Sequence, residues 1–187
     1  QIGEDLDRGV IEVEPRHDVE AVIVCCGDGR LFGALYDLVV EEAGHDTGHM
    51  EYDLGATPPG GLWVFSSDAP FEEKEVRTQA VKTYAGLHDT DIVILGIHED
   101  CGKLKAEYGF DPKTEEGREV QESVIERISA EAFTYWSNQQ DEHGRNFKPR
   151  IIRFNATGVM DEKTRKMTFK PEDITEKVRR FAEVGER

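Results

Sequence analysis

Two short apolar segments, each followed closely by cysteine or histidine, constrain this chain more than any other feature of its sequence. Residues 21–26 read Ala-Val-Ile-Val-Cys-Cys, and residues 91–97 read Asp-Ile-Val-Ile-Leu-Gly-Ile. Short apolar runs that are rich in β-branched residues are typical of strands that are buried on both faces of a parallel sheet. We therefore expect both segments to be central strands that end in polar turns.

Helical patterns separate these strands along the chain. The expected helices cover residues 31–43, 71–87, 98–108, 114–139 and 171–184, the last opened by Pro171; a further strand covers 150–154, and a weaker one 50–54. Strands that alternate with helices indicate an α/β fold with a mainly parallel central β-sheet flanked by helices. At 187 residues the chain is expected to form a single domain, residues 1–187, with an N-terminal arm at 1–20.

Composition excludes several classes of function. The chain has 23 Lys and Arg against 39 Asp and Glu, a net charge of −16, which disfavours binding to nucleic acid or to anionic membranes. No apolar run reaches the roughly 18 residues that a membrane-spanning helix needs, and residues 1–16 lack the basic and apolar pattern of a signal peptide. We therefore expect a soluble, cytoplasmic protein.

The cysteine pattern points to metal ligation or thiolate chemistry. The chain has three cysteines, two of them adjacent, which is a poor basis for disulfides. Cys26 is the last residue of the first apolar segment, and His98 and Cys101 follow the second. If the two strands are neighbours, their carboxyl ends bring two thiolates and one imidazole together, the set that catalytic zinc uses. Alternation along the strand sends Cys25 to the opposite face, where a small buried side chain is expected.

The residues around these ligands resemble the motifs of a known family. Residues 26–30, Cys-Gly-Asp-Gly-Arg, and residues 98–102, His-Glu-Asp-Cys-Gly, resemble the Cys-x-Asp-x-Arg and His-x-x-Cys-Gly motifs of the β-class carbonic anhydrases. The order of the motifs also agrees, and the resemblance extends from about residue 20 onward. Gly29 replaces the usual serine, and the Arg-x-Ala-Gly-Asn loop has no clean match, which is typical of a divergent, compact member.

The resemblance implies an activity and a role for each motif residue. It implies reversible hydration of carbon dioxide to bicarbonate by a zinc-bound hydroxide, a lyase reaction, with Cys26, His98 and Cys101 as zinc ligands. Asp28 would accept a hydrogen bond from the hydroxide, and Arg30 would hold Asp28 away from the metal. It also implies a homodimer or a dimer-based assembly.

Other interpretations of the same residues stay open. The site could hydrolyse COS or CS2, or it could hold structural zinc in a non-catalytic protein, with Asp28 as a fourth ligand. Asp28 and Arg30 could also be an ordinary ion pair at a helix start, and the three ligand residues could be ordinary core residues. His45 and His49, spaced His-x-x-x-His among glycines, are expected to be surface loop residues and not a second metal site.

Overall fold

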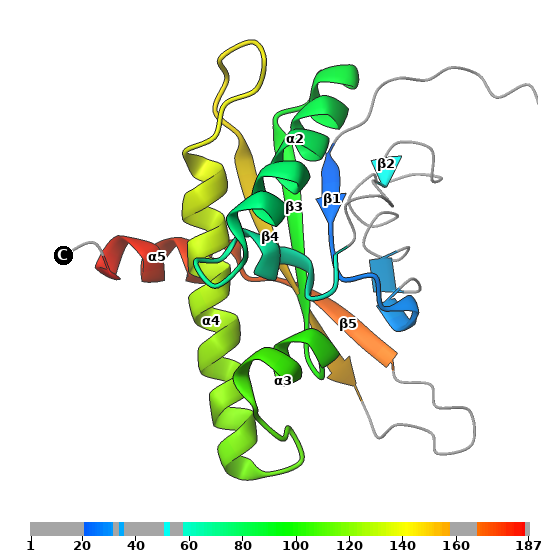
Figure 1. Cartoon of the computed structure of the whole chain (residues 1–187), viewed down its shortest axis with the longest axis vertical. Coiled ribbons are helices and arrows are strands. Elements are labelled where there is room, and N and C mark those ends of the chain that lie inside the picture. The colour runs from blue at the N-terminus through cyan, green and yellow to red at the C-terminus, as the bar shows by residue number, and fades with distance from the viewer. Residues whose placement is uncertain (1–20, 32–33, 36–50, 53–57, 158–167, 186–187) are drawn as a thin grey trace, which may run out of the picture.

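The computed structural model describes residues 21–31, 34–35, 51–52, 58–157 and 168–185, and these hold one five-stranded sheet (Figure 1). The strands are β1 (Val22–Val24), β2 (Glu51–Tyr52), β3 (Ile92–His98), β4 (Lys148–Thr157) and β5 (Thr168–Asp173). Their order across the sheet is β2-β1-β3-β4-β5, and every neighbouring pair is parallel except β4 and β5. The expected α/β class with a mainly parallel sheet is confirmed.

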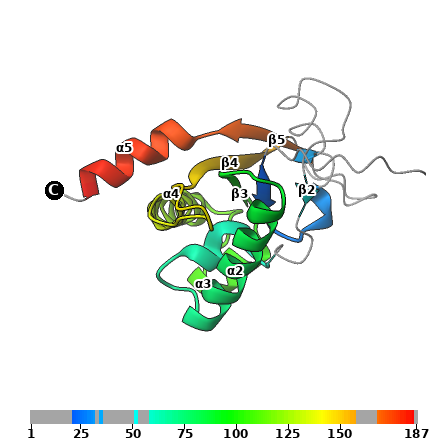
Figure 2. The same ribbon diagram turned by 90° about the horizontal axis from the view of Figure 1, so that it is seen from above.

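Two long helices cover one face of this sheet (Figure 2). Among the described residues, the α-helices include α2 (Phe71–Leu87), α3 (Gly102–Tyr108), α4 (Glu115–Ser137) and α5 (Thr175–Gly185), and the 3-10 helices include η1 (Gly29–Leu31) and η3 (Gly61–Phe65). Figures 1 and 2 show α2 and α4 against the same side of the sheet, and α5, which follows β5, packs beside α4. Val81 of α2 and Ile128 of α4 are fully buried in the apolar core beneath that face.

Alternation along the strands builds a second apolar cluster on the opposite face. Val22 and Val24 point into the core under the helices, whereas Ile23 and Cys25 belong to the other cluster, with Phe154 of β4. Successive side chains of a strand point to opposite faces, so β1 must be apolar throughout to serve both clusters. The burial of all three residues of β1 explains why the segment is continuously apolar.

The C-terminal region differs from the sequence prediction. Pro171 was expected to open a helix, but it lies in β5 opposite Phe154, and α5 begins at Thr175. Proline cannot donate a ladder hydrogen bond and is tolerated at the edge of a sheet, and β5 is an edge strand. The sequence pattern does not predict this antiparallel strand, and its partner β4 is longer than the strand predicted at 150–154.

Most other predicted elements are present within the described residues. The helix at 71–87 and the strand at 91–97 are confirmed within one residue, and the helix expected at 98–108 begins only at Gly102. Most of the helix expected at 31–43, together with His45 and His49, lies outside the described residues. No described helix is both long and apolar enough to cross a membrane.

Candidate metal centre

The pairing of β1 with β3 brings the two motifs to one edge of the sheet. The two strands are parallel neighbours, with Val24 opposite Leu95. Cys26 lies two residues beyond the end of β1, and His98 is the last residue of β3. Parallel neighbours end at the same edge, where open α/β sheets bind their ligands. The register therefore accounts for the meeting of residues that are 72 positions apart in the sequence (98 − 26 = 72).

Three potential ligand atoms converge at this edge. Sulfur or nitrogen atoms of Cys26, His98 and Cys101 all lie within 4.8 Å of one another. His98 and Cys101 are buried, and Cys26 is partly buried. Cys101 directly precedes α3, so the turn after β3 places it close to His98. The structure thus brings together all three residues that the sequence predicted as ligands.

The imidazole of His98 is oriented for ligation by one nitrogen. Its Nδ1 lies 2.7 Å from the backbone carbonyl oxygen of Glu99, which can only accept, so Nδ1 carries the proton and donates it. Its Nε2 is buried and has no hydrogen-bond partner among the described residues. A buried acceptor without a partner is costly, and a bound metal ion would satisfy it.

The two thiols titrate as a pair. The hydrogen bond from Cys101, and to a smaller degree the one from the Gly60 amide, lowers the pKa of Cys26 to about 4. The same contact with Cys26, together with burial, raises the pKa of Cys101 far above its ordinary value. Without a metal, one proton is therefore shared between two sulfurs, because two thiolates this close repel each other.

This donor set fits zinc. Thiolate and imidazole ligands of zinc lie about 2.3 Å and about 2.0 Å from the ion, so tetrahedral neighbours are about 3.5 to 3.8 Å apart. The observed spread of up to 4.8 Å requires only small side-chain movements to reach that geometry. Soft sulfur ligands combined with one imidazole favour zinc over magnesium or calcium.

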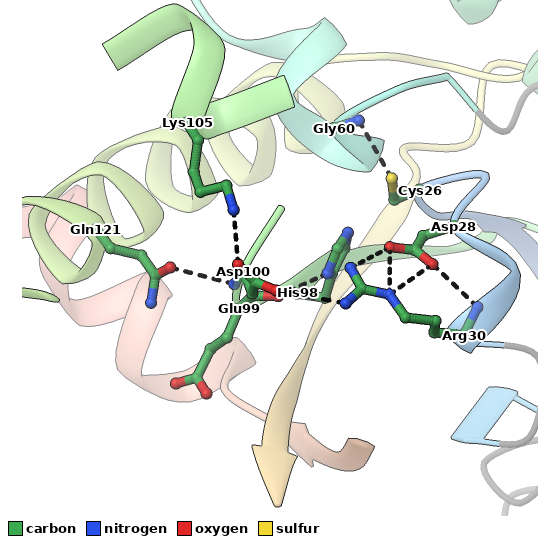
Figure 3. A network of polar contacts seen from close by, with 9 residues as sticks. All are labelled: Cys26, Asp28, Arg30, Gly60, His98, Glu99, Asp100, Lys105 and Gln121. Atoms are coloured by element: carbon green, nitrogen blue, oxygen red, sulfur yellow. Dashed lines mark hydrogen bonds and ion pairs between the residues drawn. The ribbon is translucent and has the colours of Figure 1, made fainter. Parts of the chain in front are cut away.

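Asp28 and Arg30 form a tight ion pair beside these ligands (Figure 3). Arg30 Nε lies 3.0 and 2.9 Å from the two carboxylate oxygens, and Arg30 Nη2 lies 2.5 Å from Oδ2. The backbone amide of Arg30 also donates to Oδ1, at 3.0 Å, as the chain enters η1. Hydrogen bonding by Arg30 lowers the pKa of Asp28, so the carboxylate is ionised at neutral pH.

Three further residues contact this site and were not predicted from the sequence. The amide of Gly60, from the loop before η3, donates to Cys26 Sγ at 3.4 Å. Phe169 of β5 packs edge-on against the His98 ring, with centroids 5.6 Å apart, and lies 5.7 Å from the Arg30 guanidinium. Asp100 accepts a hydrogen bond from Arg30 Nη1 at 3.3 Å. Only Asp100 gave a sequence signal, because it lies between two predicted ligands.

Cys25 lies away from this group. It is buried in the apolar cluster on the face of the sheet opposite to the helices. A Cβ atom added at Gly96 of β3 would lie only 2.8 Å from the Cys25 Cβ, so the two strands pack tightly there. The structure therefore gives Cys25 the buried packing position that strand alternation predicted.

Comparisons with known proteins give one similar structure. A carbonic anhydrase from Glaciozyma antarctica is 18% identical in sequence and superimposes with a TM-score of 0.44, and the similarity covers 87% of each chain. No family model matches the chain, and no curated protein matches it. A similarity of this extent leaves the function to be argued from the residues of the chain itself.

Proposed function

We propose that the protein is a zinc-dependent carbonic anhydrase that interconverts carbon dioxide and bicarbonate. The observation that supports this most is the placement of a Cys2His ligand set beside an ionised carboxylate that arginine holds in place. Three protein ligands leave a fourth position for solvent, which is typical of catalytic rather than structural zinc. The two sequence motifs that provide these residues resemble those of the β-class family.

The proposed chemistry divides between the metal and the protein. Zinc in this site would acidify a water molecule enough to supply hydroxide near neutral pH. A carboxylate oxygen of Asp28 would accept a hydrogen bond from the O–H group of that nucleophile, and would thereby direct the lone pair of the nucleophile toward carbon dioxide. Arg30 would keep Asp28 in that orientation through its three side-chain hydrogen bonds.

The test is a series of carbon dioxide hydration rates at different pH values, made on protein whose zinc content is measured at every point. Wild type should hold about one zinc per chain and hydrate carbon dioxide, with rates that rise through the neutral range. Arg30→Ala should retain zinc and lose most activity, because Asp28 is released to bind the metal. Asp28→Ala should also retain zinc and be impaired, because the nucleophile is no longer oriented.

Each alternative corresponds to a different outcome. Zinc-loaded wild type that is inactive toward carbon dioxide but hydrolyses COS or CS2 would replace the proposed substrate and keep the site. Zinc without any of these activities would favour a structural metal. Equal rates in wild type and Arg30→Ala would remove the ion pair from the mechanism. We also propose a homodimer, which sedimentation of the zinc-loaded protein would test.

A further inference from the structure

The side chain of Arg30 is held at two places, and only one of them is Asp28. Its Nε and Nη2 groups face Asp28, whereas the remaining amino group, Nη1, lies 3.3 Å from Asp100 Oδ2. The other oxygen of Asp100 accepts a hydrogen bond from Lys105 Nζ at 2.8 Å. Figure 3 shows the resulting chain of alternating charges, which runs from Asp28 through Arg30 and Asp100 to Lys105.

The backbone at Asp100 is itself unusual. Its φ is +56°, in the left-handed region that residues other than glycine seldom adopt, although Asp and Asn tolerate it best. Its amide donates to Oε1 of Gln121, a buried residue of α4, at 3.2 Å. The turn between His98 and Cys101 is therefore fixed by α4, and this turn places the Asp100 carboxylate against Arg30.

From these contacts we propose that Asp100 is a positioning residue for the Asp28–Arg30 pair. A guanidinium bound along one edge can still tilt together with its partner carboxylate. A second carboxylate on the remaining amino group prevents that movement. Asp100 thereby keeps Asp28 directed away from the metal without touching substrate or metal. This inference rests on the proposed function, because it assigns Asp100 a role in the same site.

A purely structural role for Asp100 makes a different prediction. If the residue only allows the left-handed turn, asparagine and glycine should replace it without consequence, since both adopt positive φ. Asp100→Asn keeps the turn and most of the side-chain volume but removes the charge, and Asp100→Gly keeps the turn without a side chain. Neither variant changes a predicted ligand, so both should fold and bind zinc.

The closing experiment measures Arg30 directly. Nitrogen relaxation of the Arg30 Nε–H group by NMR should show a rigid side chain in wild type and a lower order parameter in both Asp100 variants, with or without zinc. The hydration rate should fall about tenfold in each variant at unchanged zinc content, the usual size of an outer-shell effect. Asp68→Asn is the matched control, because Asp68 pairs with Arg127 at 2.6 Å outside this site.

The outcomes separate the two proposals. Unchanged Arg30 dynamics in both Asp100 variants would overturn the positioning role, whatever the activity. A wild type that shows no carbon dioxide hydration would overturn the proposed function, and the relaxation data would still decide whether Asp100 holds Arg30. Arg30 mobilised by Asp68→Asn would show that the effect is not specific to Asp100, and this would also overturn the inference.

Discussion

Addition of a single methyl group at Gly61 is expected to disrupt the candidate metal centre. A Cβ atom there would lie 2.3 Å from the Gly96 carbonyl oxygen and 2.9 Å from the Cys26 amide nitrogen. Both neighbours are backbone atoms, so neither can move aside as a flexible side chain would. The loop or the ends of β1 and β3 would have to shift, and the candidate ligands Cys26 and His98 lie just beyond β1 and at the end of β3.

The expected loss of stability follows from a comparison with Gly109, which terminates α3. Gly61 and Gly109 have similar backbone angles, φ +56° and +69°, but nothing among the described residues lies within 4 Å of a Cβ at Gly109. Alanine in the left-handed region costs about 1 to 2 kcal/mol at either position. Overpacking adds about 1 to 3 kcal/mol at Gly61 alone. Gly61→Ala should therefore be about 2 kcal/mol less stable than Gly109→Ala, and changes in the unfolded chain cancel between them.

Urea denaturation of both variants, followed by circular dichroism in the presence of a chelator, measures this difference without any contribution from metal. Zinc content after dialysis measures the effect on the site, and we expect Gly109→Ala to match wild type and Gly61→Ala to lose most of its zinc. Equal losses of stability in the two variants, or wild-type zinc affinity in Gly61→Ala, would refute the steric argument.

Two other predictions concern the ligands and the dependence of stability on pH. Cys101→Ala should abolish stoichiometric zinc binding, whereas Cys25→Ala should retain it. Elemental analysis measures the zinc content of both variants, and loss of zinc from Cys25→Ala would contradict the assignment of Cys25 to the apolar core. Hydrogen bonds from Arg153 lower the pKa of Glu122 below its ordinary value of 4.5. The stabilisation of the folded state by this ion pair is therefore fully present above that pH, and it is lost as pH falls through the lower, folded-state pKa. Because 42% of the Glu122 side chain is exposed, Glu122→Gln should reduce the free energy of unfolding by only about 0.5 kcal/mol at pH 7. The difference should disappear in acid, and a constant difference at all pH values would contradict it.

The centre of the sheet could be predicted from sequence because its strands are short and unambiguous. Residues 21–26 and 92–97 carry no charged or strongly polar side chain, and polar turns follow both segments. This pattern predicts two buried strands, and parallel strands that are neighbours end at the same edge of the sheet. The meeting of Cys26, His98 and Cys101 needed only one further assumption, that the two strands are neighbours. The structure satisfies it through the pairing of β1 with β3.

The parts that sequence did not predict depend on contacts between distant segments. The strand β5 contains Pro171 and precedes a helix, so its pattern resembles a helix start, and only pairing with β4 makes it a strand. Phe169 reaches His98 through that pairing. In the same way, the left-handed backbone of Asp100 has no signature in composition or periodicity, and its contact with Arg30 depends on how the turn before α3 is held.

The hydrogen bonds of Asp28 bear directly on whether the fourth coordination position of a metal in this site would be open to solvent or closed by Asp28. Both of its oxygens already accept hydrogen bonds from Arg30, two of them on each oxygen. For Asp28 to bind a metal through either oxygen, at least part of this set would have to break, and charge-assisted hydrogen bonds contribute more than neutral ones. Arg30 would also be left with an incompletely paired charge while still held by Asp100. Ligation by Asp28 therefore competes with an arrangement that the surrounding residues already stabilise, and this competition favours an open fourth position as long as Arg30 is present.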